Sequence, residues 1–182
     1  YTGWYTLSLH DALPIFNLGC GEKKIAGFTG VDKIRTEATD IVHDLDSYPY
    51  PFPNNSADEI LMDNVLEHLS DTIRTMEEIW RICRPGAVVK INVPYFKSNS
   101  AFTDPTHKHF FTENSFKYFQ AGHSLSFYSS ARFEILKTEL VSRKDFKDAK
   151  HFFRDKLPFK RLLNYFLFNI YDELRFELRC QK

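Results

Sequence analysis

The sequence predicts one α/β domain built around a mainly parallel sheet, and three observations carry this prediction. From Phe16 onward, short apolar runs alternate with turn signals and helical stretches. The chain has 182 residues, of which 43% are hydrophobic and 26% charged, so it can bury a core of its own. No apolar run approaches the roughly 18 residues that span a bilayer. This composition excludes disordered, collagen-like and transmembrane chains.

Seven runs of the sequence have the apolar pattern and the flanking turn signals of strands. Five of them lie in the first half of the chain and two in the second. We expect strands at Ile15–Leu18, Phe28–Val31, Asp40–His43, Glu59–Met62, Ala87–Val93, Phe133–Val141 and Phe176–Cys180.

The clearest helix is expected over Asp71–Cys83, and residues 84–86, Arg-Pro-Gly, should end it. A second, short helix is expected over Glu113–Phe119, with Thr112 as its N-cap. The apolar residues of the first helix recur at helical spacing on one face, namely at Ile73, Met76, Ile79, Trp80 and Cys83.

Charge and cysteine content narrow the class of protein. The 24 Lys and Arg balance the 24 Asp and Glu, and zero net charge argues against nucleic acid as a partner. The front of the chain is acidic and residues 131–182 are basic. The three cysteines, Cys20, Cys83 and Cys180, are odd in number and have no metal-binding spacing. They indicate a reducing compartment, so we expect a cytoplasmic protein.

The first residues need separate treatment, because the string TLSLHDALPI matches what one reading frame of a widely used sequencing-library adapter encodes. We expect residues 1–15 to be a non-native, adapter-derived segment and residues 16–182 to form a single domain. The alternative is an ordinary N-terminal strand in ALPIF.

Polar groups follow the expected strands at one edge of the sheet. Gly19 and Gly21 come directly after the first strand, where glycines let the backbone approach a ligand closely. Asp32 ends the second strand and can accept both hydroxyls of a ribose. Asp44 follows the third strand as a candidate partner of an adenine amino group, and Asn64 follows the fourth. One such loop could be a plain turn, but the recurrence predicts a nucleoside pocket.

The strings NLGCGE, FTGVDK, IVHDLD, PFPNNSADEILMDNVLEHL and RICRPGAVVKINVP together resemble a known family. It is the class I S-adenosylmethionine-dependent methyltransferases, in particular the methyltransferase type 11-like group with a shortened front half. The resemblance implies a Rossmann-like sheet, mainly parallel with an antiparallel last strand, and helices on both faces. It also implies a cofactor-binding half over residues 16–94 and an acceptor-side and lid half over residues 95–182.

The resemblance further implies that the cofactor is S-adenosylmethionine. Asp32 would hold its ribose, and Glu67 and His68 would lock the loop before the helix. Asn17 stands where many members have an acid, and its amide can still hydrogen-bond the glycine loop. The implied cofactor-binding residues are Asn17, Gly19, Cys20, Gly21, Asp32, Asp44, Leu45 and Asn64.

The front half departs from the usual pattern. About ten residues separate the first two strands and about eight the next two, whereas parallel crossovers usually need a dozen or more. The helices there must be reduced to turns. Gly19, Gly21 and Lys24 also fail to complete GxGxxG, which argues against a nicotinamide-binding domain.

Candidate catalytic residues follow the fifth strand, in the string DPTHKHFF. Methyl transfer mainly requires alignment of acceptor and methyl group, and a base is needed only for a hydroxyl or a protonated amine. His107 or His109 could be that base. Alternatively, Asp104 caps the turn at Pro105 and the histidines brace the loop. Asp104, His107 and His109 could also hold a metal, but no further ligand is visible, so we expect none.

The tail is basic and aromatic over residues 143–161 and then apolar in LLNYFLFNIYDEL. This pattern predicts peripheral contact of residues 143–172 with the inner membrane surface, or a cover over a lipid-linked acceptor. Core or lid packing and a dimer contact are the alternatives. The expected acceptor is a small molecule, a glycan or a lipid-linked intermediate. A non-catalytic binding or assembly module with the same fold is the main rival.

Overall fold

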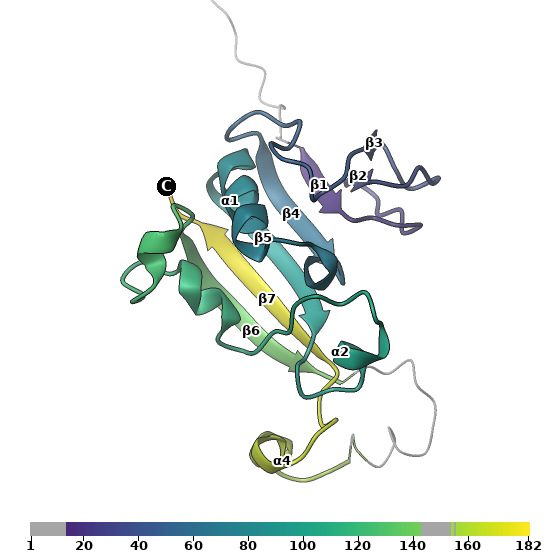
Figure 1. The fold of residues 1–182 in the computed structure, drawn as a ribbon, viewed down its shortest axis with the longest axis vertical. Helices are drawn as coiled ribbons and strands as arrows, with labels where there is room; N and C mark the ends of the chain where they lie inside the picture. Colours follow the sequence, from purple (N-terminus) through teal and green to yellow (C-terminus); the bar gives the residue numbers. More distant parts are fainter. Residues whose placement is uncertain (1–13, 143–153, 155) are drawn as a thin grey trace, which may run out of the picture.

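The computed structural model describes residues 14–142, 154 and 156–182. These residues form a seven-stranded sheet in the order β3-β2-β1-β4-β5-β7-β6 (Figure 1). Neighbours from β3 to β5 are parallel, and β7 is antiparallel to both β5 and β6. The strands are β1 Ile15–Leu18, β2 Thr29–Asp32, β3 Ile41–Val42, β4 Ala57–Asp63, β5 Cys83–Pro94, β6 Phe133–Val141 and β7 Glu173–Cys180.

The predicted mainly parallel sheet with an antiparallel last strand is therefore confirmed. The expected bounds of the first and sixth strands are those observed. Strand β5 begins earlier than expected, because Cys83 already pairs with Ala57 of β4. Residues 84–86 thus belong to a strand. Of the segment expected to be non-native, the structure describes only Pro14 and Ile15, and Ile15 pairs with Glu59 in the sheet.

Helix α1, Thr72–Ile82, connects β4 to β5 and confirms the main helix prediction. It begins at Asp71, whose side chain accepts a hydrogen bond from the Arg74 backbone at 2.9 Å. Met76, Ile79 and Ile82 are fully buried. Ile73, expected on the same face, lies at its margin and is 38% exposed.

The other helices are short: η1 Leu66–His68, α2 Ser100–Thr103, η2 Ser115–Phe119, η3 Ser126–Tyr128 and α4 Lys160–Phe166. The helix expected over Glu113–Phe119 is the 3₁₀ helix η2, and Thr112 is not its N-cap. The Thr112 hydroxyl instead accepts from the Asn114 backbone at 3.2 Å, which closes a local turn before the helix begins.

The connections between the first three strands are turns, as their lengths predict. Residues 19–28 and 33–40 contain no helix. The second turn packs directly on β2, because a Cβ at Gly30 would lie 2.0 Å from the Ala38 carbonyl oxygen. Asp40 also accepts a hydrogen bond from the Gly30 backbone at 2.8 Å. Side-chain hydrogen bonds thus replace helix packing in the front half.

The sheet has two different faces. One face carries a buried row that crosses four strands and consists of Phe16, Ile60, Val89 and Leu178. In the next row, Phe176 contacts Phe116 of η2, and the centroids of the two rings are 4.6 Å apart. Helices α1 and η2 both cover this apolar face.

The opposite face carries charged pairs among the described residues. Lys90 contacts Glu59 at 2.7 Å, and Arg179 contacts Glu134 at 3.1 Å. Helices were expected on both faces, but the connections that would supply the second set, residues 19–28 and 33–40, are turns. Complementary charges therefore occupy much of this face.

Two isoleucines of α1 provide a matched test of this packing. We predict that Ile79→Ala lowers the free energy of unfolding by about 2–5 kcal/mol, because it leaves a cavity in the core. Ile73→Ala removes the same atoms at the margin and should cost less than about 1 kcal/mol. Urea denaturation of both variants measures the difference, and equal losses would show that α1 does not bury the face described.

Candidate functional site

A pocket of about 260 Å³ opens at the carboxyl ends of β1, β2 and β4. Parallel α/β sheets bind ligands at this edge. Five of the eight residues expected to bind the cofactor line it. The pocket is lined by Gly19, Asp32, Lys33, Asp44, Leu45, Asp46, Asn64, Val65, His68, Leu69 and Lys108.

The glycine loop after β1 is tied to β2. The backbone N–H groups of Gly19 and Cys20 both donate to the Val31 carbonyl, at 2.8 and 3.1 Å. Gly19 has a positive φ of 73°, and a Cβ there would lie 2.4 Å from a methyl carbon of Val65. Only glycine therefore lets the backbone form this wall of the pocket without displacing Val65.

Asp32 is held in place by two backbone groups. One carboxylate oxygen accepts from the Gly21 N–H and the other from the Ile34 N–H, both at 2.9 Å. Each carboxylate oxygen has a second lone-pair site. The side chain is thus fixed before any ligand binds, and it can accept the two hydroxyls of a ribose.

Both acids after β3 line the pocket, but they differ in their hydrogen-bond partners. Asp44 lines the pocket, and one of its oxygens accepts from the Asp46 N–H at 3.0 Å. Asp46 accepts from the backbone and hydroxyl of Ser70 at 2.7 and 2.9 Å. Burial opposes ionisation of Asp46, but the hydrogen bonds from Ser70 and the charge of Lys108 outweigh it and lower its pKa. Asp46 therefore joins the turn to the start of α1.

Three of the residues expected to bind the cofactor do not line the pocket, namely Asn17, Cys20 and Gly21. The buried amide of Asn17 donates to the Lys23 carbonyl at 3.3 Å, which braces the glycine loop. Cys20 is buried, and its sulfur lies 3.6 Å from the Ala38 carbonyl oxygen. These residues shape the loop, whereas the lining residues present atoms to a ligand.

Asn64 lines the pocket directly after β4. It adopts a positive φ of 57°, and its N–H donates to the Asn92 carbonyl at 2.9 Å. Its side-chain amide donates to Asp63 at 3.3 Å, and Asp63 in turn pairs with Lys23 at 2.6 Å. The glycine loop and the loop after β4 are therefore linked beside the pocket.

The candidate catalytic residues separate in the structure. His107 lies beside His68 of the pocket wall, with ring centroids 4.7 Å apart. Its Nε2 is 4.0 Å from a carboxylate oxygen of Glu67. His109 has a buried Nε2 with no partner among the described residues. Asp104 accepts from the backbone and hydroxyl of Thr106 at 2.8 and 2.6 Å, so it closes a local turn.

Glu67 is the most perturbed group near the pocket. Its side chain is fully buried, and neither carboxylate oxygen has a hydrogen-bond partner in the described part of the chain. Burial, with the nearby charges of Asp63, Asp104 and Glu173, raises its pKa to about 7. Its backbone carbonyl does lock the loop, because it accepts from the backbone N–H of Lys108 at 2.8 Å.

The grouping of Glu67, His68 and His107 was not predicted from the sequence, which gave Glu67 and His68 a loop-locking role. The available signal was that two ionisable residues, Glu67 and His68, follow within five residues of the end of a strand that ends at the pocket.

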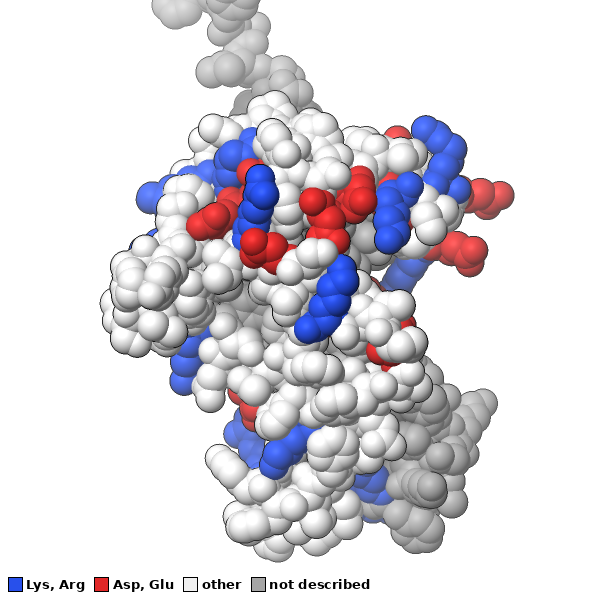
Figure 2. All heavy atoms as spheres, viewed as in Figure 1, with Lys and Arg blue, Asp and Glu red and all other residues white. Residues whose placement is uncertain are grey.

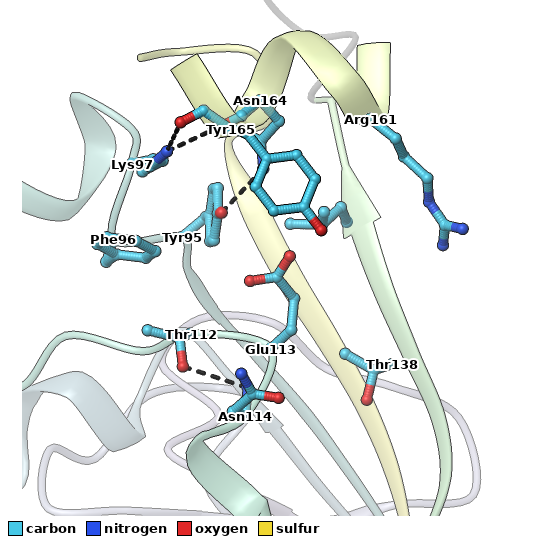
Figure 3. A pocket seen from close by; sticks show the side chains of 11 residues that line it. Tyr95, Phe96, Lys97, Thr112, Glu113, Asn114, Thr138, Arg161, Asn164 and Tyr165 are labelled. Atoms are coloured by element: carbon cyan, nitrogen blue, oxygen red, sulfur yellow. Dashed lines mark hydrogen bonds between the residues drawn. The ribbon is translucent and has the colours of Figure 1, made fainter. Parts of the chain in front are cut away.

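A second cavity, of about 550 Å³, lies beyond the end of β5. Tyr95, Glu113 and Tyr165 direct polar ends into it (Figure 3). Asn164 of α4 donates to the Tyr95 hydroxyl at 2.9 Å, and Lys97 donates to the Asn164 carbonyl at 2.7 Å. The lining residues are Tyr95, Phe96, Lys97, Thr112, Glu113, Asn114, Thr138, Leu140, Arg161, Asn164 and Tyr165.

Exposed aromatic side chains gather on and near α4. Figure 2 shows charged side chains mixed over the upper half of the molecule, whereas uncharged ones dominate the lower half. Phe102 stacks on Phe110 with centroids 4.7 Å apart and lies 6.3 Å from Phe168. We call the set the aromatic patch: Phe102, Phe110, Phe159, Tyr165, Phe166 and Phe168.

Of residues 143–172, which were expected to contact a membrane, residues 143–153 and 155 lie outside the described part of the chain. Among the residues that the structure does describe, no helix has the length and hydrophobicity needed to cross a bilayer.

Comparison with known proteins gives one family match. The family model described as a methyltransferase domain matches residues 17–91, which run from β1 into β5. No curated protein is significantly similar to the chain.

Solved structures share the fold at low identity. An S-adenosylmethionine-dependent methyltransferase from Archaeoglobus fulgidus is 17% identical, with a TM-score of 0.63 over 93% of this chain and 86% of that one. The [4+2]-cyclase SpnF is 15% identical, with a TM-score of 0.60 over 95% and 76%. Phosphoethanolamine N-methyltransferase 2 from Haemonchus contortus, bound to S-adenosylmethionine, is 16% identical, with a TM-score of 0.57 over 94% and 49%.

The raised pKa of Glu67 predicts a pH dependence of stability in metal-free, EDTA-containing buffer. Between pH 4.5, its ordinary pKa, and about 7, the native state holds a proton that the unfolded chain releases. Stability should therefore fall as pH rises through this window, by up to about 3 kcal/mol for this group.

Glu67→Gln removes this ionisation without changing the shape of the side chain. Urea denaturation at pH 5 and pH 8 should show the parent losing more stability than the variant over this interval. Identical pH dependence of the two proteins would contradict the assignment.

Proposed function

We propose, from the class I S-adenosylmethionine-dependent methyltransferase fold of this chain, that it transfers a methyl group from S-adenosylmethionine to a small-molecule, glycan or lipid-linked acceptor. The observation that carries the proposal is Asp32, fixed by two backbone groups at the wall of a pocket that the glycine loop and Asn64 close.

The residues present fit this cofactor. Asp32 and Asp44 both offer carboxylate oxygens to the pocket, and Gly19 adds a stretch of its wall without a side chain. Such groups accept ribose hydroxyls and an adenine amino group. Leu45 supplies a buried apolar side chain beside Asp44. Asn64, which lines the pocket after β4, suits the amino-acid portion.

When bound, S-adenosylmethionine supplies an electrophilic methyl group. The protein then has to orient the acceptor and, for a hydroxyl or ammonium acceptor, remove a proton. We assign proton acceptance to Nε2 of His107 or His68. The buried Glu67 stabilises the imidazolium that results. Asp104 acts as a positioning residue through Thr106, whose hydroxyl lies 2.9 Å from His68.

His109 has no direct role in this account. Its backbone N–H donates to the Glu67 carbonyl at 3.2 Å, which supports a bracing role.

For the acceptor, we infer an amphipathic or lipid-linked molecule. The second cavity is lined by both charged and aromatic residues, and the aromatic patch adjoins it through Tyr165, which is 78% exposed. Exposed aromatic side chains near basic residues favour an anionic membrane surface. A cytoplasmic protein at the inner membrane surface is consistent with this acceptor.

A non-catalytic binding or assembly module is the second candidate. The specific observation in its favour is that the fold is shared with SpnF, whose name describes a cyclase. The class I fold alone therefore does not fix methyl transfer.

Donor binding gives the first test. We predict that calorimetric titration detects S-adenosylmethionine and its demethylated product, and that Asp32→Ala weakens both by at least about tenfold, because two hydrogen bonds to a charged group are lost. Glu37→Ala, which changes an exposed acid outside the pocket, is the matched control and should bind as the parent does.

Thermal melting checks that each variant is folded. Unchanged binding by a folded Asp32→Ala protein would overturn the ribose assignment. A folded parent that binds neither compound would favour the non-catalytic module.

Membrane association gives a second test. We predict co-sedimentation with phosphatidylserine-containing vesicles at low salt, weakened at high salt because exposed charges are screened. Phe166→Ser should reduce binding about tenfold, since it removes one inserted aromatic side chain. Phe127→Ser, equally exposed but outside the aromatic patch, is the control. No binding at either salt, or equal loss in both variants, would contradict the prediction.

A further inference from the structure

We propose that Glu67, His68 and His107 bind a divalent transition-metal ion of the Zn²⁺ class beside the cofactor pocket. One ligand atom from each of the three residues lies within 4.8 Å of the others. Two elements far apart in sequence supply them, η1 after β4 and the loop after α2. The inference concerns metal binding and holds whether or not the chain transfers methyl groups. Because a bound ion would use the lone pairs of both Nε2 atoms, the proton acceptance assigned above to His107 or His68 applies to the metal-free protein.

The hydrogen bonds of His107 fix which ring nitrogen faces the cluster. Its Nδ1 lies 2.8 Å from the Ala101 carbonyl oxygen. A carbonyl can only accept, so Nδ1 carries the proton and donates. The lone pair of the neutral ring is therefore on Nε2, which faces Glu67 at 4.0 Å.

The same argument applies to His68 through a relay. Thr106 has its hydroxyl oxygen 2.6 Å from an Asp104 carboxylate oxygen and 2.9 Å from Nδ1 of His68. The hydroxyl proton goes to the carboxylate, so the hydroxyl oxygen accepts from Nδ1 of His68. The lone pair of the His68 ring is therefore on Nε2. Metal-binding histidines characteristically donate their other N–H to a carbonyl or to a carboxylate-linked group.

Glu67 supplies the independent observation. A fully buried carboxylate with no hydrogen-bond partner on either oxygen among the described residues is costly, and such a group in a folded protein indicates a bound ion or water. The charges of Asp63, Asp104 and Glu173 add to the negative potential there. A divalent cation would compensate this charge.

The donor set matches a known type of metal site. Two imidazole nitrogens and one carboxylate hold catalytic zinc and leave a position open for water or substrate. With bonds of about 2.0–2.1 Å, tetrahedral ligand atoms lie about 3.3 Å apart, so side-chain rotations that shorten the observed separations would complete the site.

The set considered from the sequence, Asp104, His107 and His109, is less suited to a metal. One Asp104 oxygen is already engaged by Thr106, and His109 is outside the cluster.

The test is zinc titration of the full chain, stripped with EDTA and free of any polyhistidine tag, in competition with a chromogenic chelator. We expect one Zn²⁺ per chain. Glu67→Gln and His107→Asn should each weaken binding by at least about tenfold, because each removes a direct ligand. His109→Asn and His123→Asn are the controls and should keep the parent affinity.

A melting experiment supplies a second readout. Zn²⁺ should raise the melting temperature of the parent and not that of Glu67→Gln, since only a ligand that binds the native state stabilises it. The proposal is overturned if the folded parent binds no stoichiometric Zn²⁺, if both ligand variants bind as the parent does, or if His109→Asn alone abolishes binding. Donor binding is measured separately through Asp32, so failure of one proposal leaves the other standing.

Discussion

The site depends on how Asp32 is held at the end of β2. Its carboxylate accepts backbone hydrogen bonds from Gly21 and Ile34, and so joins the two turns that flank the strand. These turns are too short for helices, and Gly30 lets the second one pack directly on β2. One side chain therefore orders the front half and presents the oxygens that a nucleoside would contact.

The cluster of Glu67, His68 and His107 beside the pocket lowers the stability of the protein and provides reactive groups. Helix α1 and the apolar face of the sheet provide the core, while Glu67 is buried a few residues before α1 begins and its carboxylate has no hydrogen-bond partner among the described residues. The rigid end of β4 holds one part of the cluster. The loop after α2 carries His107 and is fastened to the Glu67 carbonyl by the N–H of Lys108. The cluster thus sits where strained or unsatisfied groups usually mark function.

Much of the fold follows from the sequence, because apolar periodicity and strand-end rules are local. They predicted the helix α1, and they placed Asp32 and Asn64 at one edge of the sheet. The grouping of Glu67 with His107 depends on docking between segments about 40 residues apart, which no local pattern encodes. Thr112 was mistaken for a cap because the same residue type also closes local turns. One face of the sheet is polar because the connections between the first three strands are turns and provide no helices to cover it.

A crystal structure of the chain with the demethylated product of S-adenosylmethionine tests the central claim most directly. The account predicts the ribose hydroxyls within hydrogen-bonding distance of Asp32, the adenine beside Asp44 and Leu45, and the amino-acid end toward Asn64. A nucleoside bound elsewhere, for example in the cavity beside Tyr95 and Glu113, would contradict it.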